Sequence, residues 1–196
     1  MFLSNTKEKI HQWFTQKAQG KSAPWWLSII SFTESSFFPI PPDPFLIAVL
    51  IVKRNAWLKY SLLVAFMSVL GAIFGYVIGY SFYELFGQPL VDFYSLHEEL
   101  EKVATLFNNN TFWTMFVAAF TPIPFKLFTI AGGLFKVNIF TFVVASVLGR
   151  GIRFLIIGYL MKVFGKKIGE LIFKYFNIGS IIILVLILGY VGLKFL

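Results

Sequence analysis

Prolines and carboxylates interrupt an otherwise apolar segment near the start of this chain, in the sequence FTESSFFPIPPDPF at 32–45. The chain has 196 residues, of which 58% are hydrophobic and 13% charged, so its composition lies outside that of soluble globular domains. A proline inside a helix removes a backbone hydrogen bond and costs about 3 kcal/mol. The segment is therefore predicted to form two short helices that meet at a break, within an all-α integral membrane protein.

Three other apolar stretches run without such an interruption, at 60–84, 137–161 and 168–196. A helix needs about 20 apolar residues to cross the hydrocarbon core of a bilayer, and each stretch is long enough. We therefore expect about three transmembrane helices. The segments 24–52 and 111–135 contain PIPPDP and TPIPFK, so each is expected to be a re-entrant hairpin. The predicted hairpin tips contain Pro39, Pro41, Pro42, Pro122 and Pro124.

Basic residues predict the orientation of these segments, because lysine and arginine near span ends mark the cytoplasmic side. They flank both ends of 24–52 and follow 137–161, whereas the outer loop at 85–110 is acidic and contains a helical pattern at 96–107. We expect a cytoplasmic N-terminus, with a basic amphipathic segment at 1–23, and two hairpins that enter from opposite faces. The net charge of +8 is explained by this orientation, so no nucleic-acid partner is predicted.

The two hairpin-and-span units resemble each other in sequence. FPIPPDPFLIA at 38–48 and TPIPFKLFTIA at 121–131 share six of eleven residues, and GAIFGYVIGY at 71–80 resembles GIRFLIIGYL at 151–160. Because an odd number of crossings separates the units, we expect an inverted repeat, as in many transporters. The repeat sets Asp43 opposite Lys126 and predicts that the two tips meet near the middle of the membrane.

A small-residue face is predicted on the first span. Gly71, Gly75 and Gly79 are spaced by four residues, so they lie on one side of a helix. Small residues at this spacing let another helix approach closely. We interpret them as a helix-packing surface and not as part of a binding site.

Five ionisable residues lie within the predicted membrane-embedded regions: Glu34, Asp43, Lys126, Arg150 and Arg153. An isolated charge at that depth costs roughly 2.5–3.5 kcal/mol, so these groups are expected to pair, to be hydrated or to bind a ligand. The three cations outnumber the two carboxylates, which suits an anionic guest such as a phosphate-bearing headgroup. The alternative is that they form static ion pairs that hold the hairpins together.

Enzyme chemistry has little support in the sequence. The chain has no cysteine, and neither of its two histidines falls in an embedded segment. No two-histidine metal motif or serine nucleophile motif is found. The sequence therefore predicts no catalytic residue, no metal and no cofactor.

The motifs ESSFFPIPPD at 34–43, GAIFGYVIGY at 71–80, FTPIPFK at 120–126 and GRGIRF at 149–154 resemble the bacterial DedA family of the VTT (SNARE-associated) superfamily, in particular its YqaA-like branch. The resemblance covers roughly 25–167 and supports a membrane domain at 24–167. It implies oppositely oriented re-entrant hairpins in the bacterial cytoplasmic (inner) membrane. It also implies translocation of phospholipid or polyprenyl-phosphate lipids, linked in some members to the proton gradient.

The resemblance also assigns positions to the family's charged residues. Glu34 and Asp43 match its acidic pair. Thr121 stands where the main DedA branch usually has an arginine, and Lys126 stands at the position of its second basic residue.

Two functions remain open on the sequence. The first is a lipid flippase or scramblase that passes a phosphate-bearing headgroup through a polar cleft between the hairpins. The second is a proton- or cation-coupled transporter of a small solute, with Glu34 and Asp43 as coupling sites. A cleft that opens sideways to lipid favours the first, and a sealed central cavity favours the second. The sequence does not indicate an oligomeric state.

Overall fold

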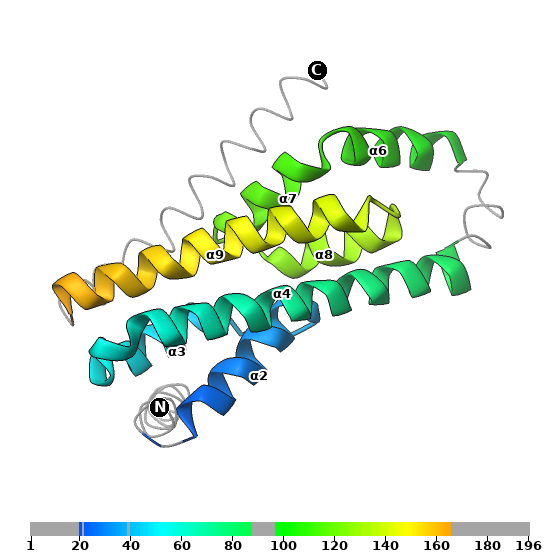
Figure 1. Ribbon diagram of the computed structural model, residues 1–196. Helices are drawn as coiled ribbons and strands as arrows, with labels where there is room; N and C mark the ends of the chain where they lie inside the picture. Colours follow the sequence, from blue (N-terminus) through cyan, green and yellow to red (C-terminus); the bar gives the residue numbers. More distant parts are fainter. Residues whose placement is uncertain (1–19, 21, 39, 88–96, 166–196) are drawn as a thin grey trace, which may run out of the picture.

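The computed structural model describes residues 20, 22–38, 40–87 and 97–165, and within these ranges the chain is helical and contains no strand (Figure 1). The predicted all-α class is confirmed for this part of the chain. The predicted C-terminal span at 168–196, most of the segment 1–23, part of the loop 85–110 and the tip residue Pro39 lie outside the described residues.

Two long helices form the centre of the molecule. They are α4 (Trp57–Phe82), preceded by the short η1 (Arg54–Ala56), and α9 (Ile139–Phe164). Each has 26 residues, so each is about 39 Å long, which exceeds the thickness of a bilayer core. Both are apolar enough to cross a membrane. They run in opposite directions beside each other (Figure 1).

Each proline-containing segment forms two short helices with a break between them. The first consists of α2 (Ala23–Ser36) and α3 (Pro42–Val52), and the second of α7 (Thr111–Phe120) and α8 (Phe125–Leu134). Prolines lie where the second helix of each pair begins. Proline is tolerated there because backbone N–H groups in the first turn of a helix form no hydrogen bond within the helix, so the missing N–H of proline costs nothing. Pro42 is the first residue of α3, and Pro124 directly precedes α8.

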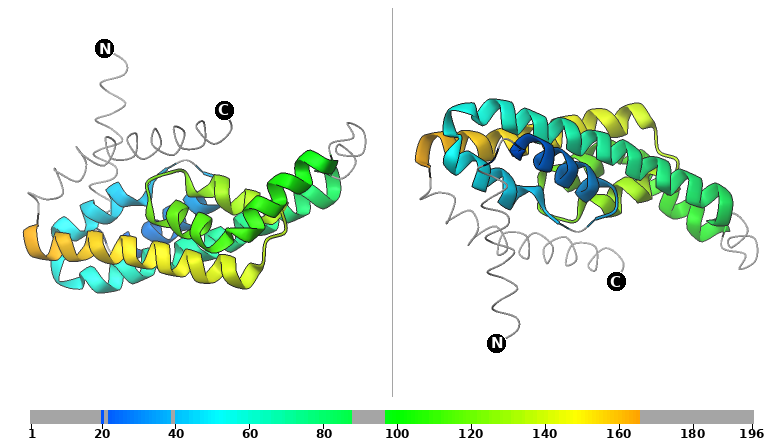
Figure 2. Two further views of the ribbon diagram at one scale, coloured as in Figure 1. Left: turned by 90° about the horizontal axis from the view of Figure 1, so that it is seen from above. Right: turned by 90° about the horizontal axis from the view of Figure 1, so that it is seen from below.

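The two helix pairs extend from opposite ends of the long helices and turn back beside their middle (Figures 1 and 2). Helix α2 packs on α4 and α7 packs on α9, whereas α8 packs on α4 and α3 contacts α9. Each pair therefore contacts both long helices. Re-entrance into a membrane and an inverted repeat stay predictions, because both depend on how a bilayer surrounds these helices.

Glycines bring the short helices close to α4. A Cβ atom at Gly71 would lie 2.1 Å from the carbonyl oxygen of Phe32 on α2, and one at Gly79 would lie 1.9 Å from the carbonyl oxygen of Ile130 on α8. Gly75 faces both of these helices from the same side of α4. The glycine face predicted from the sequence is therefore a packing surface, on which α2 and α8 lie against α4 at backbone contact.

Hydroxyl groups reinforce the contact between α2 and α4. Ser31 donates a hydrogen bond to the carbonyl oxygen of Val64 at 2.7 Å, and Ser36 donates one to that of Gly71 at 2.9 Å. Both serines are completely buried, so they need these acceptors. Polar bonds of this kind fix the position of α2 along α4, which apolar packing alone would not specify.

Polar contacts also fasten the two ends of the long-helix pair. At one end, Arg54 donates to the carbonyl oxygens of Lys162 and, at 2.7 Å, of Val163 in the last turn of α9. At the other end, Lys136 in the turn before α9 forms an ion pair with Glu84 in η2 (Tyr83–Gly87). The hydrogen bond to Glu84 raises the pKa of Lys136 above its ordinary value, so the lysine stays charged at neutral pH.

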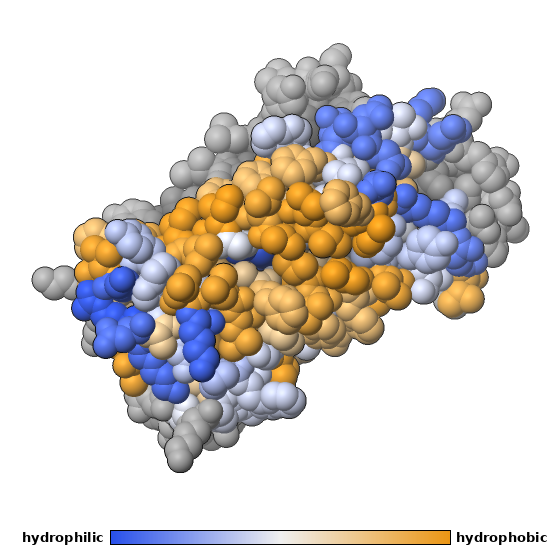
Figure 3. Space-filling model, in the orientation of Figure 1, coloured by the Kyte–Doolittle hydropathy of each residue, from blue (hydrophilic) through white to orange (hydrophobic). Residues whose placement is uncertain are grey.

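The surface has the polarity expected of a membrane protein. On the face shown in Figure 3, hydrophobic residues form a continuous band over the middle of the molecule, and hydrophilic residues gather at both ends. The hydrophilic end beyond α4 includes α6 (His97–Asn109), which lies within the region where the sequence predicts an outer loop with a helical pattern. An apolar band between two polar ends matches the profile of a bilayer.

Gly71→Ala tests the close contact between α2 and α4. The added methyl group would overlap the backbone of α2, so we expect a loss of about 1–3 kcal/mol of stability. Gly151→Ala is the matched control, because a Cβ atom there has nothing within 4 Å and alanine favours a helix. Thermal unfolding of the full chain in detergent measures both. Equal unfolding temperatures for the two variants would contradict the assigned packing role.

Candidate functional site

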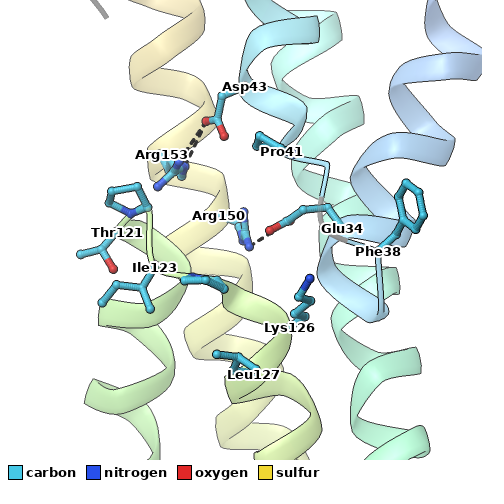
Figure 4. Close-up of a pocket in the computed structure, with 12 residues that line it drawn as sticks. Glu34, Phe38, Pro41, Asp43, Thr121, Ile123, Lys126, Leu127, Arg150 and Arg153 are labelled. Atoms are coloured by element: carbon cyan, nitrogen blue, oxygen red, sulfur yellow. Dashed lines mark hydrogen bonds and ion pairs between the residues drawn. The ribbon is translucent and has the colours of Figure 1, made fainter. Parts of the chain in front are cut away.

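A cavity of about 340 Å³ lies beside the middle of α9, where the two breaks come together (Figure 4). Its volume falls within the range of about 300–1,000 Å³ that is typical of small-molecule sites. Pro41 from the first break and Pro122 and Pro124 from the second form part of its wall. The two predicted tips therefore line one cavity, in which irregular backbone is sheltered by protein.

Arg153 connects both breaks to α9. Its Nε and Nη2 atoms donate to Oδ1 of Asp43, in the first turn of α3, at 3.2 and 3.1 Å. Its Nη1 atom donates at 2.9 Å to the carbonyl oxygen of Phe120, the last residue of α7. A carbonyl group at a helix C-terminus has no partner within its own helix, so the guanidinium supplies the missing donor. The side chains of Arg153 and Asp43 are only 7% and 6% exposed.

Arg150 forms the second buried ion pair. Its Nη2 atom donates to Oε2 of Glu34 on α2 at 3.2 Å, and the same oxygen accepts a hydrogen bond from Ser35 at 3.1 Å. The Ser35 hydroxyl lies 2.7 Å from the hydroxyl of Ser68 on α4, so Glu34 is linked to both long helices. The Arg150 guanidinium also lies 4.2 Å from the ring centroid of Phe125, a cation–π distance.

Lys126 differs from the two arginines, because it forms no ion pair with any residue that the structure describes. It lines the cavity and points into the same space as Glu34 and Arg150 (Figure 4). Lys126 is the second residue of α8, and the N-terminus of this helix has no side-chain cap. A helix N-terminus carries a partial positive charge. Lys126 and the start of α8 therefore add positive charge to a wall whose carboxylates are paired with the two arginines.

The structure places all five embedded charges of the sequence prediction around one cavity, but their pairing differs from the arrangement that the repeat suggests. The repeat sets Asp43 opposite Lys126, whereas Asp43 pairs with Arg153. The reason is that α3 contacts α9 and α8 packs on α4, so the two first turns face different helices. Both arginines form ion pairs, which join the first helix pair to α9 and not to the second helix pair; whether these pairs are static stays open. The surplus positive charge belongs to Lys126.

Several contact groups of the site were not predicted from the sequence. Ser35 directly follows Glu34, and Ser68 lies one turn before Gly71 on the small-residue face of α4, so the pattern contained a signal for these two hydroxyls. The carbonyl oxygen of Phe120 is a backbone group and has no side-chain signal. Its role depends on the tertiary position of α7 beside α9.

Comparison with known proteins gives two significant relatives and one family. The sequence model of the VTT domain matches residues 40–163. An uncharacterized protein of Haemophilus influenzae is 31% identical over 188 residues, which cover 95% of this chain and 95% of the relative. An uncharacterized protein of Histophilus somni is 32% identical over 188 residues, which cover 95% and 96%. No solved structure matches the chain significantly.

The coupling between Arg153 and Asp43 can be measured with a double-mutant cycle. Arg153→Met leaves a buried carboxylate without its cation, which typically costs about 3–5 kcal/mol. We expect the additional change Asp43→Leu to recover part of this loss, because it removes the stranded charge. The apparent unfolding temperature of each purified full chain is the readout. Lys126→Met serves as the control and should not lower it; strictly additive losses in the cycle would show that the two side chains are not coupled.

Proposed function

This chain belongs to the VTT domain family of DedA membrane proteins, and on that premise we propose that it is a lipid translocator for a phosphate-bearing headgroup. Members of this family are membrane proteins with transport-related or lipid-related functions. The single observation that most supports the proposal is the cavity at the two breaks. Its wall contains a lysine that has no ion-pair partner among the described residues, and apolar side chains lie at its rim.

The opening of the cavity favours a lipid over a small solute. Phe38 and Leu127 line the cavity and are 46% and 59% exposed, so apolar side chains form its rim at the molecular surface. A headgroup can enter past such a rim while its acyl chains stay in the surrounding lipid. A transporter of a small polar solute needs a cavity that is closed to lipid on its sides, and the described residues of this rim do not provide that closure.

The charges have separate tasks in the proposed mechanism. Lys126 and the N-terminus of α8 attract the phosphate, because Lys126 forms no ion pair with a described residue, whereas both carboxylates of the cavity are paired with arginines. The arginine–carboxylate pairs hold the two breaks in place around it. Protonation of Glu34 or Asp43 would free its arginine to contact the headgroup, and this is the step at which a proton could be coupled to transport.

The proposal includes a membrane arrangement. The two helix pairs are re-entrant hairpins that enter a bacterial cytoplasmic membrane from opposite faces, with the N-terminus in the cytoplasm. It is supported by the prolines at the breaks, by the opposite directions of the two pairs and by the basic residues around η1 (Figure 2). In this arrangement the cavity lies near the middle of the bilayer, where a headgroup meets its highest barrier.

Lipid movement in proteoliposomes tests the proposal. Purified full-length protein is reconstituted with fluorescent phospholipid or polyprenyl-phosphate reporters, and dithionite quenching reports the fraction that reaches the inner leaflet with time. We expect wild-type vesicles to redistribute a phosphate-bearing lipid faster than protein-free vesicles. Lys126→Gln should reduce this rate by roughly tenfold, because it removes the charge that attracts the phosphate.

Two further variants separate the cavity from the rest of the molecule. Asp43→Asn should also slow transport, because it disrupts the pair that holds both breaks to α9. Lys59→Gln changes an exposed lysine outside the cavity and should transport at the wild-type rate. If wild-type and empty vesicles behave alike for every lipid, the translocator proposal fails and the small-solute transporter becomes the better hypothesis.

A further inference from the structure

The cavity carries a single net positive charge. The ionisable residues that line it are Glu34 on α2, Asp43 on α3, Lys126 on α8, and Arg150 and Arg153 on α9, and the second break contributes none. Each arginine is within 3.2 Å of a carboxylate oxygen, so the two pairs are internally neutral. Lys126 remains as the charge that no described residue of the site compensates.

We propose that this cavity selects a phosphodiester headgroup with one negative charge over a phosphomonoester with two. The inference rests on the proposed function, because it concerns the lipid that enters the same site. One negative charge is balanced by Lys126, whereas a second would remain uncompensated beside ion pairs whose arginines are buried. Uncompensated charge in such surroundings is strongly unfavourable.

The arginines cannot balance the second charge without a further penalty. Arg153 uses three of its nitrogen atoms for Asp43 and the carbonyl oxygen of Phe120. Arg150 is 2% exposed, and its guanidinium is held between Glu34 and the Phe125 ring. If Arg153 turned to a ligand, it would leave the buried Asp43 without its partner. Arg150 has a buried Nε atom without a hydrogen-bond partner, but its charge is already balanced by Glu34. The preference for one negative charge therefore follows from the arrangement of all five groups.

The selectivity between the two headgroups should depend on pH. A phosphorylated side chain loses its second proton with a pKa of about 6, and a phosphomonoester at a lipid surface loses it at a higher pH, so such a lipid carries mostly two charges in alkaline solution and mostly one in acid. A phosphodiester carries one charge throughout this range. The ratio of the two transport rates therefore reports the charge of the phosphate group itself.

The test compares phosphatidylglycerol with phosphatidic acid, both carrying the same fluorescent acyl chain, in phosphatidylcholine vesicles with the full-length protein. Rates from protein-free vesicles are subtracted at each pH. At about pH 9 we expect phosphatidylglycerol to move roughly tenfold faster, and at about pH 5 we expect the two rates to converge. Thr121→Lys adds an amine to the cavity wall and should remove the preference at the higher pH. Thr121→Gln is the neutral control and should keep it.

The possible outcomes distinguish this inference from the proposed function. Equal rates at the higher pH, or faster movement of phosphatidic acid, would overturn the charge selection while the translocator proposal stands. A preference that persists in acid would also overturn it, because the selection would then depend on the glycerol group and not on charge. If neither lipid moves faster than in protein-free vesicles, the proposed function fails and the inference fails with it.

Discussion

The contact of Arg153 with both breaks is the interaction on which the architecture of the site depends. The two helix pairs extend from opposite ends of the molecule, and the chain connectivity alone does not require their breaks to lie side by side. Arg153 gives them a common partner, because it binds the Asp43 carboxylate at the start of α3 and the Phe120 carbonyl at the end of α7. Both acceptors would otherwise be polar groups without a donor in apolar surroundings. The guanidinium thus donates hydrogen bonds to an acceptor at each break and thereby fixes the position of both breaks beside α9.

This contact is possible because α4 holds α2 and α8 at backbone distance. Larger side chains at Gly71 and Gly79 would displace both helices by overlap with their backbones. Displacement of α2 would move Glu34 away from Arg150, and displacement of α8 would move Lys126 away from the cavity. The positions of the charged side chains around the cavity therefore depend on Gly71 and Gly79, which carry no charge. A cluster of five ionisable groups can exist at this depth only if helix packing places them within contact of each other.

The sequence predicts those features that follow from local rules. Proline at Pro42 and Pro124 determines where helices begin, and the spacing of Gly71, Gly75 and Gly79 identifies a packing face, because both effects depend on neighbours in the chain. The partner of Asp43 could not be predicted in this way. It depends on the packing of α3 against α9 and not against α8, and this packing is a property of the tertiary structure. The same holds for the Phe120 carbonyl and for the lack of an internal partner at Lys126 among the described residues.

The distribution of charge between the two halves would constrain any motion that the proposed function requires. The carboxylates Glu34 and Asp43 belong to the first half, and the arginines belong to the second, so both ion pairs join the halves. The first helix pair is thereby attached to α9, while α8 with Lys126 is attached to α4 through the contact of Gly79 with Ile130. Helix α2 with Glu34 is also packed on α4, through Gly71 and the serine hydrogen bonds. A movement of α4 relative to α9 would therefore carry Glu34 and Lys126 together away from the arginines and would separate Arg150 from Glu34. Because breaking a buried ion pair is costly, the Arg150–Glu34 pair opposes such a motion.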